Sequence, residues 1–131
     1  MKFRYALLYV QDVAASLRFY GQAFGLKTRF LAEGGQYGEL DVEGPVSLGF
    51  VGNAQAASNL PEGFVANDPR SRPGGFEIGL VTDDVEAAYV KAVNAGAQPA
   101  AAPAAKPWGQ TIAYVRDPDG VLVELCSPVA H

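Results

Sequence analysis

The chain has 131 residues, of which 49% are hydrophobic and 18% charged, and its formal net charge is -4. This composition is typical of a globular domain that buries a core without disulfides or a structural metal. The acidic balance argues against nucleic acid or an anionic membrane surface as partner, because both select for clustered Lys and Arg. A cationic or neutral small ligand fits the charge better.

The cysteine content and the N-terminal sequence indicate the cellular compartment in which we expect the protein. The single cysteine, Cys126, excludes an internal disulfide framework and a Cys-based zinc site, and it is compatible with a reducing cytoplasm. The first apolar run is short and reaches Gln11 and Asp12 without a small-residue cleavage pattern, so we expect no signal peptide. No window approaches the roughly 18 apolar residues of a membrane span. We therefore expect a cytoplasmic protein.

The first predicted elements are a strand and a helix. A β-rich run from Tyr5 leads to Asp12, and an amphipathic segment then continues to Gly25. Asp12 suits a helix N-cap, because its carboxylate can accept from the free amides of the first turn. Apolar residues follow at spacings of three and four, and glycine provides a left-handed stop. We predict a strand and then a helix of about 11 to 12 residues.

Three strands are predicted next, at 27–33, 36–42 and 46–52, with a turn at 43–45 between the last two. The stretch 52–75 is rich in Pro, Asn, Gly and Ser. It is expected to be a long connection, and connections of such length are usually functional or partly mobile.

The same plan repeats from Glu77, with Asp84 as the second cap and Gly96 as the second stop. A weaker strand is expected around 98–102, then a loop within 100–109, and then strands at 109–116 and 121–127. The sequence "DPDG" at 117–120 places proline second and glycine fourth, which suits a type I turn. Two βαβββ modules are thus predicted.

We expect both modules to belong to one domain, residues 1–131, because a lone βαβββ unit of about 50 residues has a marginal core. Module 1 covers about 1–51, the connection 52–75, and module 2 about 76–131.

The tandem plan, with "LLYVQDVAASLRFYGQAFGL" near the start and "WGQTIAYVRDPDGVLVEL" near the end, resembles the vicinal oxygen chelate superfamily. That group includes glyoxalase I, extradiol dioxygenases, methylmalonyl-CoA epimerase, fosfomycin-resistance enzymes and bleomycin-resistance proteins. The resemblance covers nearly the whole chain and implies an α+β fold in which curved sheets form an open barrel with helices outside. It says less about activity, because one fold hosts many chemistries.

In the metal enzymes of this superfamily, each module supplies ligands from two strand positions. Carried over to this sequence, the resemblance implies the positions Tyr5, about Gly49, Glu77 and Glu124. Strand alternation places Glu77 on the side of the barrel interior. On the last strand, the same alternation points Leu122, Glu124 and Cys126 inward. We expect the two carboxylates to converge on one cavity.

The ligand set is nevertheless incomplete for a catalytic metal. The only histidine is His131, the last residue, and zinc and oxygenase iron sites depend on imidazoles. Tyr5 carries a phenol whose ordinary pKa near 10 makes it a poor ligand at neutral pH, and Gly49 has no side chain. We expect no metal, no cofactor and no catalytic residues, which puts Lewis-acid chemistry of the glyoxalase, dioxygenase or epimerase kind in doubt. Two carboxylates could still hold a weak Mg or Mn ion.

Three interpretations of Glu77 and Glu124 stay open. They could be structural groups bonded to Tyr, Arg or water. They could contact a polar or cationic ligand. If they are desolvated together, their mutual repulsion would raise at least one pKa, so that a proton donor or a general base is conceivable.

Aromatic residues supply candidate walls for the cavity. Tyr5, Leu7 and Tyr9 alternate on the inner face of the first strand, and Tyr37 and Phe50 could add to the lining. Trp108 resembles the tryptophan that flanks the ligand crevice in the bleomycin-resistance branch, or else it is a packing aromatic. The expected ligand-binding set is Tyr5, Leu7, Tyr9, Tyr37, Phe50, Glu77, Trp108 and Glu124, which suits a flat, apolar, partly basic molecule.

The functional expectation is therefore metal-free binding of a small aromatic or cationic molecule, in the manner of antibiotic sequestration by bleomycin-resistance proteins. The resemblance implies a homodimer, with no nucleic acid and no membrane partner. The alternative is a metal-dependent lyase, isomerase or dioxygenase of the same superfamily. A third possibility is a ligandless member whose cavity is filled by its own side chains.

Overall fold

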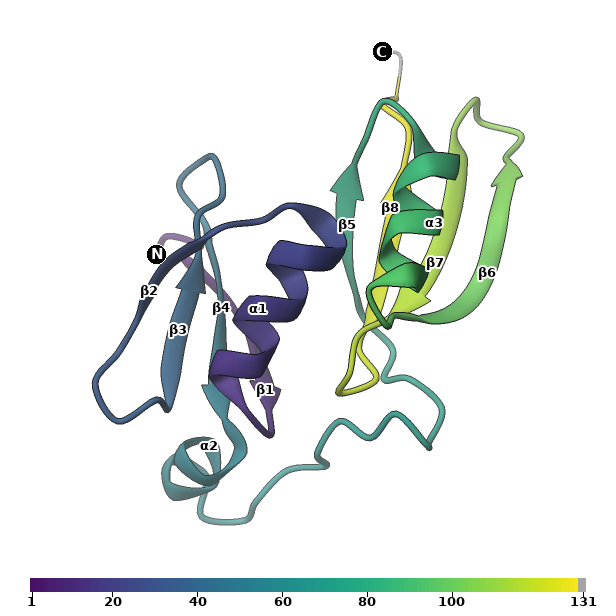
Figure 1. Cartoon of the computed structure of the whole chain (residues 1–131). Coiled ribbons are helices and arrows are strands. Elements are labelled where there is room, and N and C mark those ends of the chain that lie inside the picture. The colour runs from purple at the N-terminus through teal and green to yellow at the C-terminus, as the bar shows by residue number, and fades with distance from the viewer. Residues whose placement is uncertain (130–131) are drawn as a thin grey trace. The chain divides into compact units, whose positions relative to one another are not determined.

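The computed structural model describes residues 1–129, and the chain divides into two compact units, unit 1 (Met1–Asn67) and unit 2 (Asp68–His131) (Figure 1). Each unit is described by itself. The expectation that the modules form a single domain stays a prediction. No helix in the described part of the chain is long and apolar enough to cross a membrane.

Unit 1 is a four-stranded sheet with one long helix packed on one face. Its elements in chain order are β1 (Tyr5–Val10), α1 (Val13–Phe24), β2 (Thr28–Leu31), β3 (Tyr37–Leu40), β4 (Ser47–Gly52) and α2 (Asn53–Asn59). The strand order is β1-β4-β3-β2, with β1 parallel to β4 and the other pairs antiparallel.

Unit 2 repeats this plan. Its elements are β5 (Glu77–Val81), α3 (Val85–Asn94), β6 (Gln98–Ala105), β7 (Thr111–Arg116) and β8 (Leu122–Cys126). The strand order is β5-β8-β7-β6, with β5 parallel to β8 and the other pairs antiparallel. It matches the order β1-β4-β3-β2 of unit 1 strand by strand. The prediction of an α+β fold with tandem βαβββ modules is confirmed, and neither four-stranded sheet closes on itself.

The helix starts follow from their capping residues. Asp12 accepts a hydrogen bond from the amide of Ala15 at 3.0 Å, and Asp84 accepts one from Ala87 at 3.0 Å. Each bond satisfies an amide that has no partner within its own helix. Gly25 ends α1 in the left-handed region, with φ of 72°. Both predicted caps and the first glycine stop are confirmed.

The core of each unit lies between the helix and one sheet face. In unit 1, buried side chains on that face include Leu8, Val10, Leu40, Leu48 and Phe50, and they meet Val13, Leu17 and Tyr20 of α1. In unit 2, Val121, Val123 and Leu125 are buried as predicted. The opposite face of each sheet, away from α1 or α3, is called the inner face below.

Phe50 corrects the predicted lining. It lies opposite Leu8 in the β1–β4 register and is fully buried on the helix side, where its ring packs against Tyr20 at 5.0 Å. Because neighbouring strand residues point to opposite faces, Gly49 and Val51 take the inner positions that flank it. Phe50 belongs to the core and leaves the candidate ligand set.

The long connection is not a single free loop. It begins with α2, a helix that was not predicted from the sequence. Phe64 packs its ring on Tyr9 at 4.9 Å, and Asn67 Nδ2 donates to the Tyr9 carbonyl at 3.1 Å. Residues 53–67 therefore belong to unit 1.

The remainder of the connection is held in unit 2 by the Arg116 clamp. The buried Arg116 guanidinium donates to three backbone carbonyls, those of Gly120 at 2.9 Å, Pro69 at 3.2 Å and Asp68 at 3.2 Å. Gly120 ends the predicted "DPDG" turn, in which its amide donates to the Asp117 carbonyl at 2.9 Å. The clamp fastens the start of unit 2 to the β7–β8 turn.

Strand β6 corrects the predicted loop at 100–109, because it continues to Ala105. Alanine and proline have low strand propensity, which is why this segment appeared to be a loop. The strand lies at the sheet edge, and its register against β7 shifts at two places, between Pro99 and Ala101 and between Ala101 and Ala104. An irregular edge is where a sheet tolerates proline.

Candidate functional site

The clearest concentration of chemical groups lies on the inner face of the unit 2 sheet. Glu77 pairs with Leu122 across β5 and β8, and Gly79 pairs with Glu124. Gly79 has no side chain, and a Cβ placed there would lie 3.7 Å from Glu124 Oε2. The Glu124 carboxylate thus lies across β5 next to the position of Glu77.

Tyr114 of β7 joins the two carboxylates. Its hydroxyl lies 3.0 Å from Glu124 Oε1 and 3.4 Å from Glu77 Oε1. Glu77 and Glu124 therefore lie close together on one face of the unit 2 sheet, and their predicted convergence on one ligand cavity remains a prediction. The phenol has one hydrogen to donate, so the two carboxylates compete for it, and the shorter contact favours Glu124.

The electrostatics of this acidic cluster, defined as Glu77, Tyr114 and Glu124, follow from burial and like charge. Burial and then the Glu124 charge raise the pKa of Glu77, while the hydrogen bond from Tyr114 opposes that rise. Burial, with the hydrogen bond to Glu124 and its charge, raises the pKa of Tyr114 to about 12. The neighbouring Cys126 thiol also has a raised pKa, through burial and then Glu124. The phenol and the thiol therefore stay protonated at neutral pH.

No cation of unit 2 balances this cluster. Among residues 68–129, no Lys or Arg forms an ion pair with Glu77 or Glu124. The buried Arg116 is engaged by the three carbonyls of its clamp. The acidic cluster can therefore accept a positive charge from elsewhere.

A hollow of about 260 Å³ adjoins the cluster. It is lined by Glu77, Ala100, Ala101, Tyr114 and Leu122. Apart from one carboxylate and one phenol, its walls are aliphatic. Its volume lies just below the range usual for sites of drug-sized molecules, so it suits a small apolar group.

Three members of this site, Ala100, Ala101 and Tyr114, were not predicted from the sequence. The alanines belong to the segment read as a loop. Tyr114 could have been found by counting outward from the "DPDG" turn, because β7 and β8 form a hairpin in which Tyr114 lies opposite Glu124.

Apart from Phe50, the lining residues predicted in unit 1, namely Tyr5, Leu7, Tyr9 and Tyr37, lie on its inner face. Tyr5 and Leu7 are 53% and 38% exposed. Tyr9 is covered by the chain's own Phe64. Tyr37 donates its hydroxyl to Glu39 Oε2 at 2.5 Å. Tyr5 and Leu7 are thus the accessible members, and the ligand contacts predicted for this group remain predictions.

Trp108 lies in the turn between β6 and β7 and is 61% exposed. Its Nε1 donates to Gln110 Oε1 at 2.7 Å. The indole is therefore not a core residue, and its predicted place at a ligand crevice remains a prediction.

Glu39 is an inner-face carboxylate that was not predicted as a site residue. It lies opposite Gly49 and is only 6% exposed. A Cβ at Gly49 would lie 2.7 Å from the Gly38 carbonyl and 3.3 Å from Glu39 Cγ. The absence of a side chain at Gly49 therefore permits the close approach of the Gly38 carbonyl first, and of the Leu7 and Glu39 side chains second. In the repeat, Gly49 of β4 corresponds to Glu124 of β8, and Glu39 of β3 corresponds to Tyr114 of β7. The carboxylate of unit 1 therefore lies on β3, whereas that of unit 2 lies on β8, the equivalent of β4.

The side chains present do not match a transition-metal ligand set. Within the described residues of either unit, no three His, Cys, Asp or Glu side chains form a group that could hold a metal ion. The acidic cluster offers two carboxylates and a phenol, without the imidazoles that zinc and oxygenase iron sites use. His131 lies outside the described residues.

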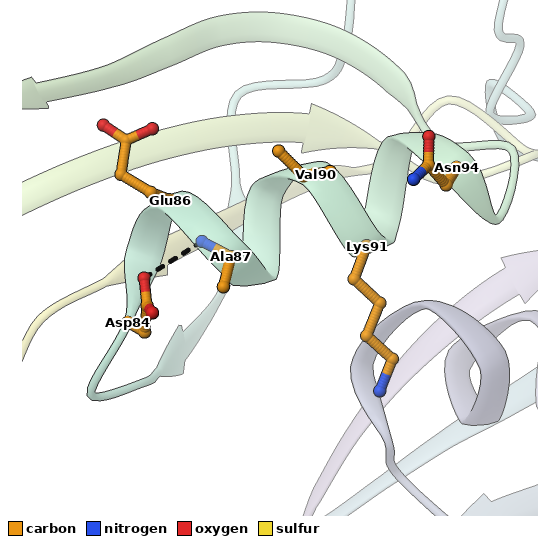
Figure 2. Close-up of a pocket in the computed structure, with 6 residues that line it drawn as sticks. All are labelled: Asp84, Glu86, Ala87, Val90, Lys91 and Asn94. Atoms are coloured by element: carbon orange, nitrogen blue, oxygen red, sulfur yellow. Dashed lines mark hydrogen bonds between the residues drawn. The ribbon is translucent and has the colours of Figure 1, made fainter.

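A second hollow, of about 670 Å³, runs along α3 and is lined by Asp84, Glu86, Ala87, Val90, Lys91 and Asn94 (Figure 2). Figure 2 shows that the six residues come from α3 and its N-cap Asp84, and that the Asp84 carboxylate accepts the capping bond from the Ala87 amide. A single helix with its cap does not enclose a ligand, so we assign this hollow no binding role.

Comparison with known proteins supports the fold. Residues 2–125 match the model of the Glyoxalase/Bleomycin resistance protein/Dioxygenase superfamily. No curated protein shows a significant match.

Three similar solved structures share 19–23% identity with this chain, a level that supports the fold alone. A glyoxalase-related enzyme from Fulvimarina pelagi has 23% identity and a TM-score of 0.81, covering 98% of this chain and 88% of its own. A superfamily enzyme from Burkholderia phytofirmans has 22% identity and a TM-score of 0.74, with 97% and 98% covered. TioX from Micromonospora has 19% identity and a TM-score of 0.69, with 97% and 98% covered.

Proposed function

Because the chain belongs to the Glyoxalase/Bleomycin resistance protein/Dioxygenase superfamily, we propose that it binds a small organic cation with an apolar or aromatic body at the acidic cluster. The observation that carries this proposal is the pair Glu77 and Glu124, which share one phenol and lack a cationic partner in residues 68–129. The protein would act by sequestration, without a metal, as in antibiotic resistance of the bleomycin-binding kind.

The chemistry of the cluster favours an ammonium or amidinium group. Two carboxylates held near one another repel, and a cation placed between them removes the repulsion while donating to both. The adjoining hollow supplies aliphatic contacts from Ala100, Ala101 and Leu122 for the body of the ligand. A neutral molecule of the same shape lacks the charge interaction with the carboxylates and keeps only the aliphatic contacts.

The test is calorimetric titration with benzamidinium, with benzamide as the neutral match. We expect benzamidinium to bind more tightly than benzamide, and Glu124→Gln to weaken benzamidinium binding about 10-fold or more, since hydrogen bonds to charged groups contribute about 1.5–3 kcal/mol. Glu86→Gln, an exposed change of the same charge on α3, is the matched control. Equal affinity for the two probes, or equal loss in both variants, would contradict the proposal.

The same protein, purified without chelator, separates sequestration from the alternative, a metal-dependent lyase, isomerase or dioxygenase. Elemental analysis should find no stoichiometric divalent ion. One equivalent per chain that Glu124→Gln removes would favour the enzyme.

We further propose a cytoplasmic homodimer. Support comes from β5, an edge strand of the unit 2 sheet, because the free backbone N–H and C=O groups of an edge strand can pair with a second chain. Light scattering coupled to size exclusion should give twice the mass of one chain. The mass of a single chain would contradict the dimer.

A further inference from the structure

Arg4 is held in place on the inner face of unit 1. Its carbonyl accepts from the Ser47 amide at 2.8 Å, and its guanidinium donates to the Ser47 hydroxyl. Ser47 is fully buried on β4, so both contacts belong to a rigid position. The guanidinium also lies 4.9 Å from the centre of the Tyr5 ring, within cation–π range.

The nearby carboxylates are engaged by other groups. Glu39 and Asp41 each lie 3.4 Å from the Arg29 guanidinium, which also donates to the Val42 carbonyl at 3.1 Å. The other oxygen of Glu39 accepts from Tyr37. Among residues 1–67, no carboxylate forms an ion pair with Arg4. A guanidinium has five N–H donors in a fixed plane, and the described contacts use few of those of Arg4.

Apolar surface adjoins this ordered cation. Tyr5 and Leu7 project from β1 on the same face, and both are exposed. An ordered arginine costs side-chain entropy that a freely solvated one retains, and a planar fork of donors matches a carboxylate in a bidentate arrangement. We propose that Arg4 anchors the carboxylate of a small organic acid whose apolar body lies on Tyr5 and Leu7. This proposal is argued from residues of unit 1 alone and does not rest on the cation site proposed for unit 2.

The test is a titration with benzoate, with benzamide as the uncharged match, followed by amide chemical shifts. We expect benzoate to bind with a dissociation constant on the order of 1 mM or tighter and to shift the amides of Tyr5 and Ser47. Arg4→Gln should weaken binding about 10- to 100-fold, because it removes charge-assisted hydrogen bonds. Arg4→Lys keeps the positive charge but loses the planar guanidinium, so its affinity for benzoate should lie between those of the parent protein and Arg4→Gln.

Two controls keep the outcome specific. Arg18→Gln makes the same charge change at an exposed position of α1 and should leave the affinity for benzoate unchanged. Glu124→Gln should also leave it unchanged, so that failure of the cation site and failure of the anion site are separate results. The proposal is overturned if benzoate shows no saturable binding, if benzamide binds equally well, or if Arg4→Gln and Arg4→Lys both bind benzoate as the parent does.

Discussion

Replacing Tyr114 with phenylalanine tests the acidic cluster most directly, because the change removes one hydroxyl and keeps the ring. That hydroxyl lies 3.0 Å from one carboxylate oxygen and 3.4 Å from another. Only one hydrogen is donated, so the loss is that of a single charge-assisted bond. Such bonds contribute about 1.5–3 kcal/mol in sheltered settings, and we take about 1 kcal/mol for this partly exposed one.

The variant should also change a titration. The Tyr114 hydroxyl favours the charged form of Glu77, whereas burial and Glu124 oppose it. Without the hydroxyl, the pKa of Glu77 should rise further, and carboxyl-detected NMR measures that rise. A folded-state pKa above the unfolded value means that the folded protein binds more protons. The contribution of Glu77 to stability is then greatest below its unfolded pKa of about 4.3 and is lost as pH rises through the folded value.

The cost of Tyr114→Phe should therefore be larger at pH 7 than at pH 4, as measured by urea unfolding at both values. Tyr89→Phe is the matched control, because no described residue of unit 2 accepts a hydrogen bond from that hydroxyl. An unchanged or lowered pKa of Glu77, or an equal loss of stability at the two pH values, would refute this account of the cluster.

Two glycines make further predictions about packing. Gly120 has φ of 92°, and a Cβ there would lie 2.6 Å from a guanidinium nitrogen of the Arg116 clamp and 2.8 Å from a backbone carbon. Gly120→Ala should lower the free energy of unfolding by about 3 kcal/mol. Gly109 has a similar φ in open space, so Gly109→Ala should lower the free energy of unfolding by only about 1 kcal/mol. Similar losses in the two variants would contradict the packing argument. Gly49→Ala should cost about 1–3 kcal/mol, because the added Cβ would lie 2.7 Å from the Gly38 carbonyl. Gly75→Ala, which meets nothing, should stay within about 0.5 kcal/mol. Chemical denaturation measures both pairs, and a neutral Gly49→Ala would contradict the need for a glycine beside the Gly38 carbonyl.

Several features were predictable because their causes are local. Asp12 and Asp84 mark the helix starts, since a cap bonds an amide three residues away. The turn before Gly120 follows from its own four residues. The inward direction of Glu77 and Glu124 follows from strand alternation, which is a property of one strand at a time. The repeated order of these signals was enough to predict two equivalent modules.

Other features depended on which strand lies beside which, and in what register. The pairing of Tyr114 with Glu124 and of Glu39 with Gly49 is a relation between strands. Phe50 was assigned to the wrong face because its strand is apolar on both sides, which hides the alternation. The alanine-rich β6 exists because β7 offers it a ladder, against the preference of its own residues.

The modules, the helix caps and the inward direction of two carboxylates could be predicted from the sequence, because each of these rests on interactions that span a few residues. The three-dimensional structure was needed to show that one phenol joins those carboxylates and that Arg116 fastens the chain to a turn. It was also needed to show that Arg4 is bonded to Ser47 and forms no ion pair with a carboxylate of unit 1. Hydrogen bonds between strands form at particular registers, and register is set by the packing of the whole sheet rather than by any one segment.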